Sequence, residues 1–88
     1  MNLNEEHFRE IEEMASLFLS PEEIAINLEV DIDEFLMEIQ LSGVVAQYYH
    51  RGRLKTSIEL RKAILQAAVN GSSPAQQMMK EFYSNTQL

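Results

Sequence analysis

The side chains best suited to chemistry in this sequence are a run of cations and tyrosines in its second half. Arg51, Lys55 and Lys62 are spaced by four and then seven residues, which brings all three within about 40° of one another on an α-helix. Such cations bind phosphate groups, and aromatic rings beside them can stack on bases. We therefore interpret this run as a candidate surface for duplex DNA, with these members: Tyr49, Arg51, Arg53, Lys55, Arg61 and Lys62.

The same run also has a purely structural explanation. Long lysine and arginine side chains cover helix surfaces without any ligand, and tyrosines pack with their hydroxyl groups in water. The chain as a whole is acidic, with a net charge of -7, whereas a nucleic-acid-binding domain is typically basic. The sequence therefore leaves open whether DNA is bound at all.

A second charged group consists of four acids, Asp31, Asp33, Glu34 and Glu38. Its functional interpretation is an interface for a basic protein partner, or for the basic run of another copy of the chain. Its structural interpretation is that Asp31 caps a helix while Asp33 and Glu34 stabilise the helix N-terminus, which leaves only Glu38 unexplained. Under either interpretation these carboxylates repel phosphate, so we do not expect this segment to read bases.

No pattern typical of an enzyme is found in the sequence. It has two histidines, His7 and His50, no cysteine and no glycine-rich loop, which leaves no motif for a metal ion or a nucleotide. Adjacent carboxylates such as Glu22 and Glu23 are expected at an exposed helix start, without the burial that acid-base catalysis requires. We therefore expect a non-catalytic protein with no cofactor and no metal.

The elements that position these groups are expected to be helices, because apolar residues recur at helical spacing and no segment alternates as a strand does. Ser20 and Glu23 form a capping box around Pro21, and Asp31 can cap the next helix after a short break. Two helices joined so tightly are typical of a helix-turn-helix. We predict helices at residues 5–18, 21–28, 32–40, 44–70 and 74–83.

Glycine and proline mark the later boundaries. Gly52 lies inside the long fourth helix and predicts a bend or a close backbone contact there. Gly71 predicts the end of that helix, since glycine readily adopts the left-handed conformation that ends many helices. Ser73 and Gln76, with Pro74 at the first helical position, predict a capping box for the last helix.

Length and charge bound the class of protein. We predict a single all-α domain at residues 1–88, with a helix-turn-helix unit at 1–43 and a helical hairpin-like extension at 44–83. Residues 1–48 contain twelve acids and one base, whereas residues 49–88 contain six bases and two acids. This asymmetry favours attraction between copies, or an anionic partner on the C-terminal half. Neither a signal peptide nor a membrane span is apparent, so we expect a cytoplasmic protein.

The order of these parts resembles the small terminase subunits of tailed bacteriophages and related prophage helix-turn-helix proteins. The resemblance covers about residues 15–83 and is most specific at the tyrosine-x-arginine-glycine step before the long helix and at the N-G-S-S-P-A segment. The residues that carry it are Ser20-Pro21-Glu22-Glu23-Ile24-Ala25, Leu28-Glu29-Val30-Asp31, Phe35, Ala46-x-Tyr48-Tyr49-x-Arg51-Gly52-Arg53, Leu60-Arg61-Lys62-Ala63 and Ala67-Ala68-Val69-Asn70-Gly71-Ser72-Ser73-Pro74-Ala75.

The resemblance implies a non-catalytic, homo-oligomeric packaging component that binds viral DNA in the bacterial host cell. Such a component presents the DNA to a separate large terminase subunit, an ATPase and nuclease. It also implies that the helix beginning near Asp31 occupies the place of a recognition helix, although here that helix is acidic. The alternative is a protein-protein interaction module on a helix-turn-helix scaffold that has lost DNA binding.

Overall fold

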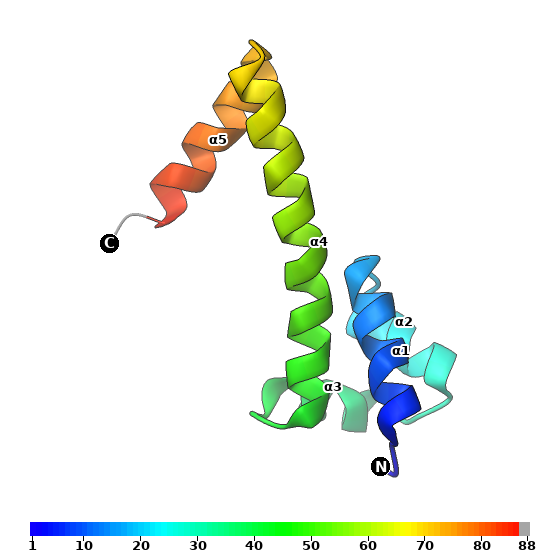
Figure 1. The fold of residues 1–88 in the computed structure, drawn as a ribbon. Coiled ribbons are helices and arrows are strands. Elements are labelled where there is room, and N and C mark those ends of the chain that lie inside the picture. The colour runs from blue at the N-terminus through cyan, green and yellow to red at the C-terminus, as the bar shows by residue number, and fades with distance from the viewer. Residues whose placement is uncertain (87–88) are drawn as a thin grey trace. The chain divides into compact units, whose positions relative to one another are not determined.

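The computed structural model describes residues 1–86 and contains five helices in that range (Figure 1). In chain order they are α1 (Glu5–Ser16), α2 (Pro21–Leu28), α3 (Ile32–Gln40), α4 (Val44–Val69) and α5 (Ser73–Thr86). No strand occurs among the described residues, and the predicted all-α class is confirmed. The chain divides into two compact units, unit 1 (Met1–Thr56) and unit 2 (Ser57–Leu88).

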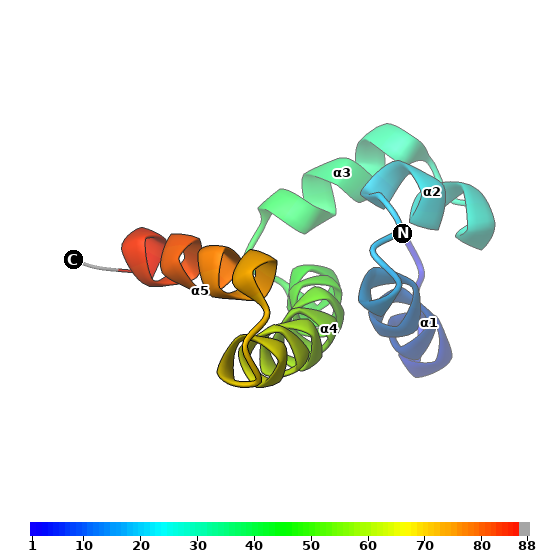
Figure 2. The same ribbon diagram turned by 90° about the horizontal axis from the view of Figure 1, so that it is seen from above.

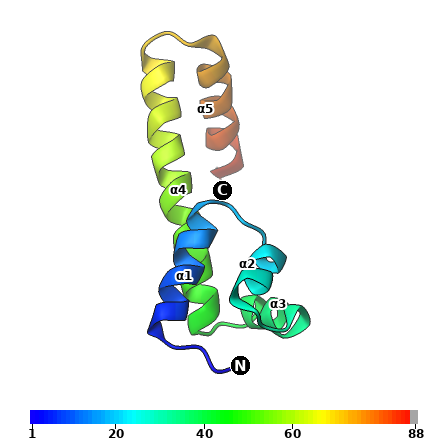
Figure 3. The same ribbon diagram turned by 90° about the vertical axis from the view of Figure 1, so that its right-hand side faces the viewer.

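The boundary between the units lies inside α4, not between residues 43 and 44 where the sequence predicted a change of organisation. The first part of α4 runs beside α1 (Figure 3), and the Thr56 hydroxyl donates a hydrogen bond to the Ser16 carbonyl oxygen. Contacts between helices therefore assign residues 44–56 to unit 1. The periodicity of a single helix does not reveal such contacts.

Side-chain caps begin α2 and α3, which lie next to each other as a helix-turn-helix requires (Figure 2). In the Ser20 capping box, the Glu23 amide donates to Ser20 Oγ at 3.1 Å and the Ser20 amide donates to Glu23 Oε1 at 2.8 Å. Asp31 caps α3 by accepting a hydrogen bond from the Glu34 amide at 2.9 Å. Both predicted caps are confirmed.

The turn between α2 and α3 is a Schellman motif without glycine. Glu29 adopts the left-handed conformation, with φ 59°, and its amide donates to the Ile26 carbonyl oxygen at 3.1 Å. The Val30 amide donates to the Ala25 carbonyl oxygen, also at 3.1 Å. This geometry ends α2 and turns the chain within three residues, so that α3 can begin at Ile32.

Helix α1 ends earlier than predicted, at Ser16 instead of Phe18. Phe18 is left-handed, with φ 61°, and its amide donates to the Ala15 carbonyl oxygen at 2.9 Å. The Leu19 amide donates to the Met14 carbonyl oxygen at 3.2 Å, which completes a second Schellman motif. The apolar spacing fits Phe18 into the helix, but the backbone reverses there, and this is why periodicity overestimated the helix.

Unit 1 is held together by one hydrophobic core to which all four of its helical segments contribute. Its largest fully buried side chains are Ile11 from α1, Ile24 from α2 and Phe35 from α3. Tyr49 from α4 packs in the same cluster and is 7% exposed. The buried members of the core are Ile11, Met14, Ala15, Ile24, Ala25, Phe35, Val45 and Tyr49.

Helix α4 passes through Gly52 as one uninterrupted α-helix. The Glu12 carbonyl oxygen and the Ala15 Cβ atom occupy the space that a side chain at position 52 would need. Of the two predictions for this glycine, the close backbone contact is therefore confirmed. Gly52 allows α1 and α4 to approach each other closely.

Unit 2 is a helical hairpin formed by residues 57–69 of α4 and by α5 (Figure 3). Gly71 adopts φ 101°, and the Ser72 amide donates to the Ala67 carbonyl oxygen at 3.0 Å, so the predicted glycine stop is confirmed. Helix α5 continues to Thr86, three residues beyond the predicted end at Tyr83.

The predicted capping box at Ser73 and Gln76 is wrong. Helix α5 already includes Ser73, and it is Ser72 whose Oγ accepts a hydrogen bond from the Ala75 amide at 3.3 Å. The Gln76 side chain instead donates to the Ala68 carbonyl oxygen at 3.0 Å, near the end of α4. Two consecutive serines make the cap ambiguous in sequence, and the tight turn after Gly71 selects the first of them.

Candidate nucleic-acid and protein interfaces

Two of the predicted DNA-binding cations share one carboxylate. Lys55 Nζ lies 2.9 Å from Glu12 Oε2, and Arg51 Nη1 lies 3.7 Å from Glu12 Oε1. The Glu12 side chain is 20% exposed, whereas Arg51 and Lys55 are 53% and 61% exposed. The two cations therefore contact α1 on one side and keep open surface on the other.

An aromatic pair supports Arg51 on the same side of α4. The Arg51 guanidinium carbon lies 4.9 Å from the centre of the Tyr48 ring, and Tyr48 stacks on Phe8 of α1 with ring centres 5.4 Å apart. A guanidinium on an aromatic face gains cation–π attraction and loses some of its freedom to move. The cation is thereby positioned before any ligand arrives.

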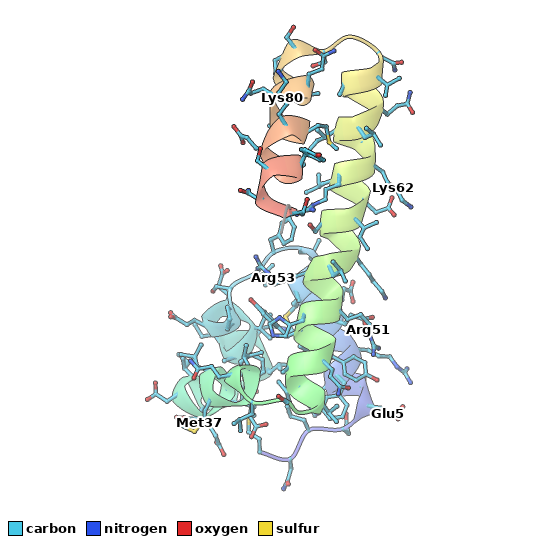
Figure 4. All side chains as sticks on the ribbon, turned by 90° about the vertical axis from the view of Figure 1, so that its left-hand side faces the viewer. Glu5, Met37, Arg51, Arg53, Lys62 and Lys80 are labelled. Atoms are coloured by element: carbon cyan, nitrogen blue, oxygen red, sulfur yellow. The ribbon has the colours of Figure 1, made fainter. Side chains whose placement is uncertain are left out.

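Arg53 leaves α4 on the other side from Arg51 (Figure 4), as expected for residues two positions apart on a helix. Its guanidinium carbon lies 5.2 Å from the centre of the Phe18 ring and 5.8 Å from that of Tyr49. The three α4 cations of unit 1 therefore lie on two sides of the helix. Arg51 and Lys55 share the side that contacts Glu12, and Arg53 lies on the other.

The six candidate DNA-binding residues are placed in three different environments. Tyr49 belongs to the core and offers no ring to a ligand, whereas the three cations Arg51, Arg53 and Lys55 lie on the surface of unit 1. In unit 2, Arg61 lies over the Phe82 ring at 4.4 Å, and Lys62 Nζ lies 3.6 Å from Glu59 Oε1. The sequence does not show which of the adjacent residues Tyr48 and Tyr49 faces the core, because that depends on where the other helices pack against α4. Tyr49 was therefore predicted to lie on the surface with the cations.

Glu12 is the member of this site that sequence reasoning missed. It lies in the acidic run of the first helix, which reads as a solvated face. Nothing in the spacing of that run singles out Glu12 from its neighbour Glu13. Only the packing of α1 against Gly52 brings Glu12 to the cations of α4.

The acidic group on α3 is a mixed surface. Asp31, Asp33 and Glu34 are exposed and Glu38 is half-buried. Asp31 acts as a cap, and Glu34 Oε1 lies 3.4 Å from the N-terminal amino group. On the same helix, the apolar Met37 is exposed and points away from α4 (Figure 4).

Unit 1 carries most of the acidic residues, whereas unit 2 is nearly neutral and exposes many apolar side chains. Unit 1 carries twelve acids and four bases, whereas unit 2 carries two acids and three bases. Ala75 is the only buried residue in the described part of unit 2. The exposed large apolar side chains of unit 2 are Ile58, Leu60, Leu65, Val69, Met78 and Tyr83.

An open groove of about 520 Å³ lies on unit 2 between α4 and α5. Leu65 and Ala68 line it from α4, and Met79, Lys80 and Tyr83 line it from α5. Within residues 1–86, no group of three histidine or acidic side chains is arranged to hold a metal ion. No helix in that range combines the length and the apolar character that crossing a membrane would require.

Comparisons with protein-family models, with curated proteins and with solved structures find no match to this chain.

Proposed function

We propose that this chain is a non-catalytic, self-associating adaptor that binds duplex DNA, similar in role to the small terminase subunits that its sequence resembles. The observation that carries the proposal is the combination of a helix-turn-helix arrangement with a hairpin whose apolar side chains are uncovered. In such a protein, the hairpins (unit 2) of several copies can associate while unit 1 of each copy contacts a ligand. Chemistry on the DNA would belong to a separate partner, an ATPase-nuclease subunit.

Self-association is supported by the composition of unit 2. A hairpin of two helices buries only one seam, and helices of this length gain most of their stability from tertiary packing. Exposed side chains such as Val69, which is 72% exposed, would be covered in a bundle of hairpins. The charges of unit 2 nearly balance, so the hairpins of two copies can meet with little electrostatic repulsion. Unit 1 is strongly acidic, so the first units of two copies repel each other.

The proposed DNA contact is made by the cations of α4 and not by the acidic start of α3. Arg51, Arg53 and Lys55 are exposed in unit 1, and Arg61 and Lys62 are exposed in unit 2. Side chains of this kind contact phosphates and give little sequence discrimination. Because each copy offers few phosphate contacts, useful affinity would depend on several copies binding together.

Fluorescence anisotropy of a labelled DNA duplex tests this function. We expect the full chain to bind at low salt and to lose affinity steeply as salt is raised. In the triple variant Arg51→Ala, Arg53→Ala, Lys55→Ala, the slope of log affinity against log salt is expected to fall by up to about three. The control is Arg9→Ala, because Arg9 is an exposed cation of unit 1 on α1, paired with Glu5 at 3.6 Å. A salt slope that falls as much in Arg9→Ala as in the triple variant would contradict the proposed surface.

A second candidate function is a protein-protein interaction module without DNA binding. The excess of acids in unit 1 favours it, as does the exposed Met37 beside Asp33 and Glu34 on α3. A surface of this composition fits a basic protein that also offers an apolar contact. Absence of DNA binding even at low salt would favour this candidate over the first.

A further inference from the structure

The contact between Glu12 and the cations of α4 is built like a binding site for an anion. Lys55 Nζ and Arg51 Nη1 converge on the two oxygens of one carboxylate, at 2.9 Å and 3.7 Å. Arg51 rests on the Tyr48 ring, and that ring rests on Phe8. An ammonium and a guanidinium held in this way match the charge and the oxygen atoms of a phosphodiester as well as those of a carboxylate.

The carboxylate fits this site incompletely. Glu12 Oε1 is buried and accepts no hydrogen bond from the described residues, since Arg51 Nη1 at 3.7 Å is beyond hydrogen-bond distance. A buried oxygen without a donor costs free energy, so the contact is weaker than a bidentate pair would be. The outer sides of Arg51 and Lys55 stay open to solvent and to a ligand.

We propose that Arg51 and Lys55 form a phosphodiester-binding pair for which the Glu12 carboxylate competes from within the chain. This inference rests on the proposed DNA binding and names both the group that is bound and the residue that restrains the binding. A phosphodiester that takes the hydrogen-bond donors now directed at Glu12 must displace its carboxylate, so the intramolecular contact lowers affinity. Because the same ion pairs are lost in every such contact, the carboxylate lowers the affinity of each contact by the same factor.

The test compares three single variants in DNA anisotropy at low and moderate salt. Glu12→Gln keeps the size of the side chain and removes its charge, and we expect affinity to rise by about threefold, the value of a modest ion pair. Glu12→Asp keeps the charge but withdraws the carboxylate by one methylene, which weakens its hydrogen bond to Lys55, so affinity should rise by less than in Glu12→Gln. The matched control is Glu13→Gln, which removes the same charge from an exposed neighbour and should change affinity little.

The outcomes separate this inference from the proposed function. If wild type binds through Arg51 and Lys55 but Glu12→Gln and Glu13→Gln behave alike, the competition is refuted and DNA binding stands. If Glu12→Asp matches wild type, the geometry of the contact has no role and the inference is likewise overturned. If neither wild type nor Glu12→Gln binds duplex at low salt, the proposed function itself fails. Far-UV circular dichroism and thermal melts of each variant establish that it is folded.

Discussion

The backbone of Gly52 in α4 lies directly against the Glu12 carbonyl oxygen in α1. A Cβ atom at position 52 would collide with that oxygen and would lie 2.9 Å from the Ala15 Cβ atom. Backbone atoms cannot move aside as the end of a flexible side chain can. The absence of a side chain at this position is therefore what brings α1 and α4 together and places Glu12 beside Lys55.

Gly52→Ala should destabilise the protein, although alanine is normally the better residue inside a helix by about 1 kcal/mol. The clash with α1 forces a backbone shift that costs about 2 kcal/mol or more, so we expect a lower free energy of unfolding. Urea denaturation followed by circular dichroism measures this. Gly43→Ala is the control, because nothing lies within 4 Å of a Cβ atom there. A Gly52→Ala variant as stable as wild type would show that α1 and α4 do not pack this closely.

Glu29→Gly should stabilise the protein. Glu29 holds the left-handed conformation, with φ 59°, and a non-glycine residue pays about 1 kcal/mol for it. Glycine relieves that strain but adds freedom to the unfolded chain, so the expected net gain in the free energy of unfolding is about 0.5 kcal/mol. Glu29→Gln serves as the control, because it removes the same charge and keeps the strain. Equal gains in both variants would assign the effect to charge and not to the turn.

The sequence predicts well those features that depend on contacts between residues close together in the chain. The Ser20 capping box, the Asp31 cap and the Gly71 stop each depend on contacts within a few positions of the chain, and all three are present. Glu12 and Tyr49 show the opposite case. Whether Glu12 faces solvent or α4, and whether Tyr49 faces solvent or the core, is decided by helices distant in sequence.

The two left-handed residues show when the end of a helix can be predicted from neighbouring residues and when it cannot. Phe18 and Glu29 both end helices in a conformation for which glycine is the usual signal. No glycine marks Phe18, so apolar spacing alone set the predicted end of the first helix and overran it. At Glu29 the end was predicted correctly, because the capping aspartate that follows supplied the missing signal.

Val69→Lys should weaken self-association without unfolding the chain. Val69 is 72% exposed in unit 2, so a lysine there disturbs little within one copy but places a charge in the proposed bundle of hairpins. Sedimentation equilibrium should show a shift toward the monomer. Gln66→Lys is the matched control, since it adds the same charge at an exposed polar position of the same helix segment. A monomeric wild type at high concentration would contradict self-association through unit 2.

Variants of Arg53 and Tyr49 should distinguish effects on DNA binding from effects on stability. The two residues are one helical turn apart on α4, but Arg53 is exposed and Tyr49 lies in the core. Arg53→Ala removes an exposed cation over Phe18 and should cost DNA affinity, while the free energy of unfolding falls by about 1 kcal/mol or less. Tyr49→Ala opens a cavity in the core of unit 1 and should lower the free energy of unfolding by about 3 kcal/mol.

The milder variant Tyr49→Phe completes this comparison. It keeps the ring in the core and removes only the hydroxyl group, so DNA affinity should equal that of wild type if Tyr49 has a structural role alone. Anisotropy titrations and urea denaturation on the same preparations measure both quantities. A loss of affinity in Tyr49→Phe with unchanged stability would return Tyr49 to the DNA-binding surface, because the buried ring would then have to reach the ligand through its hydroxyl group.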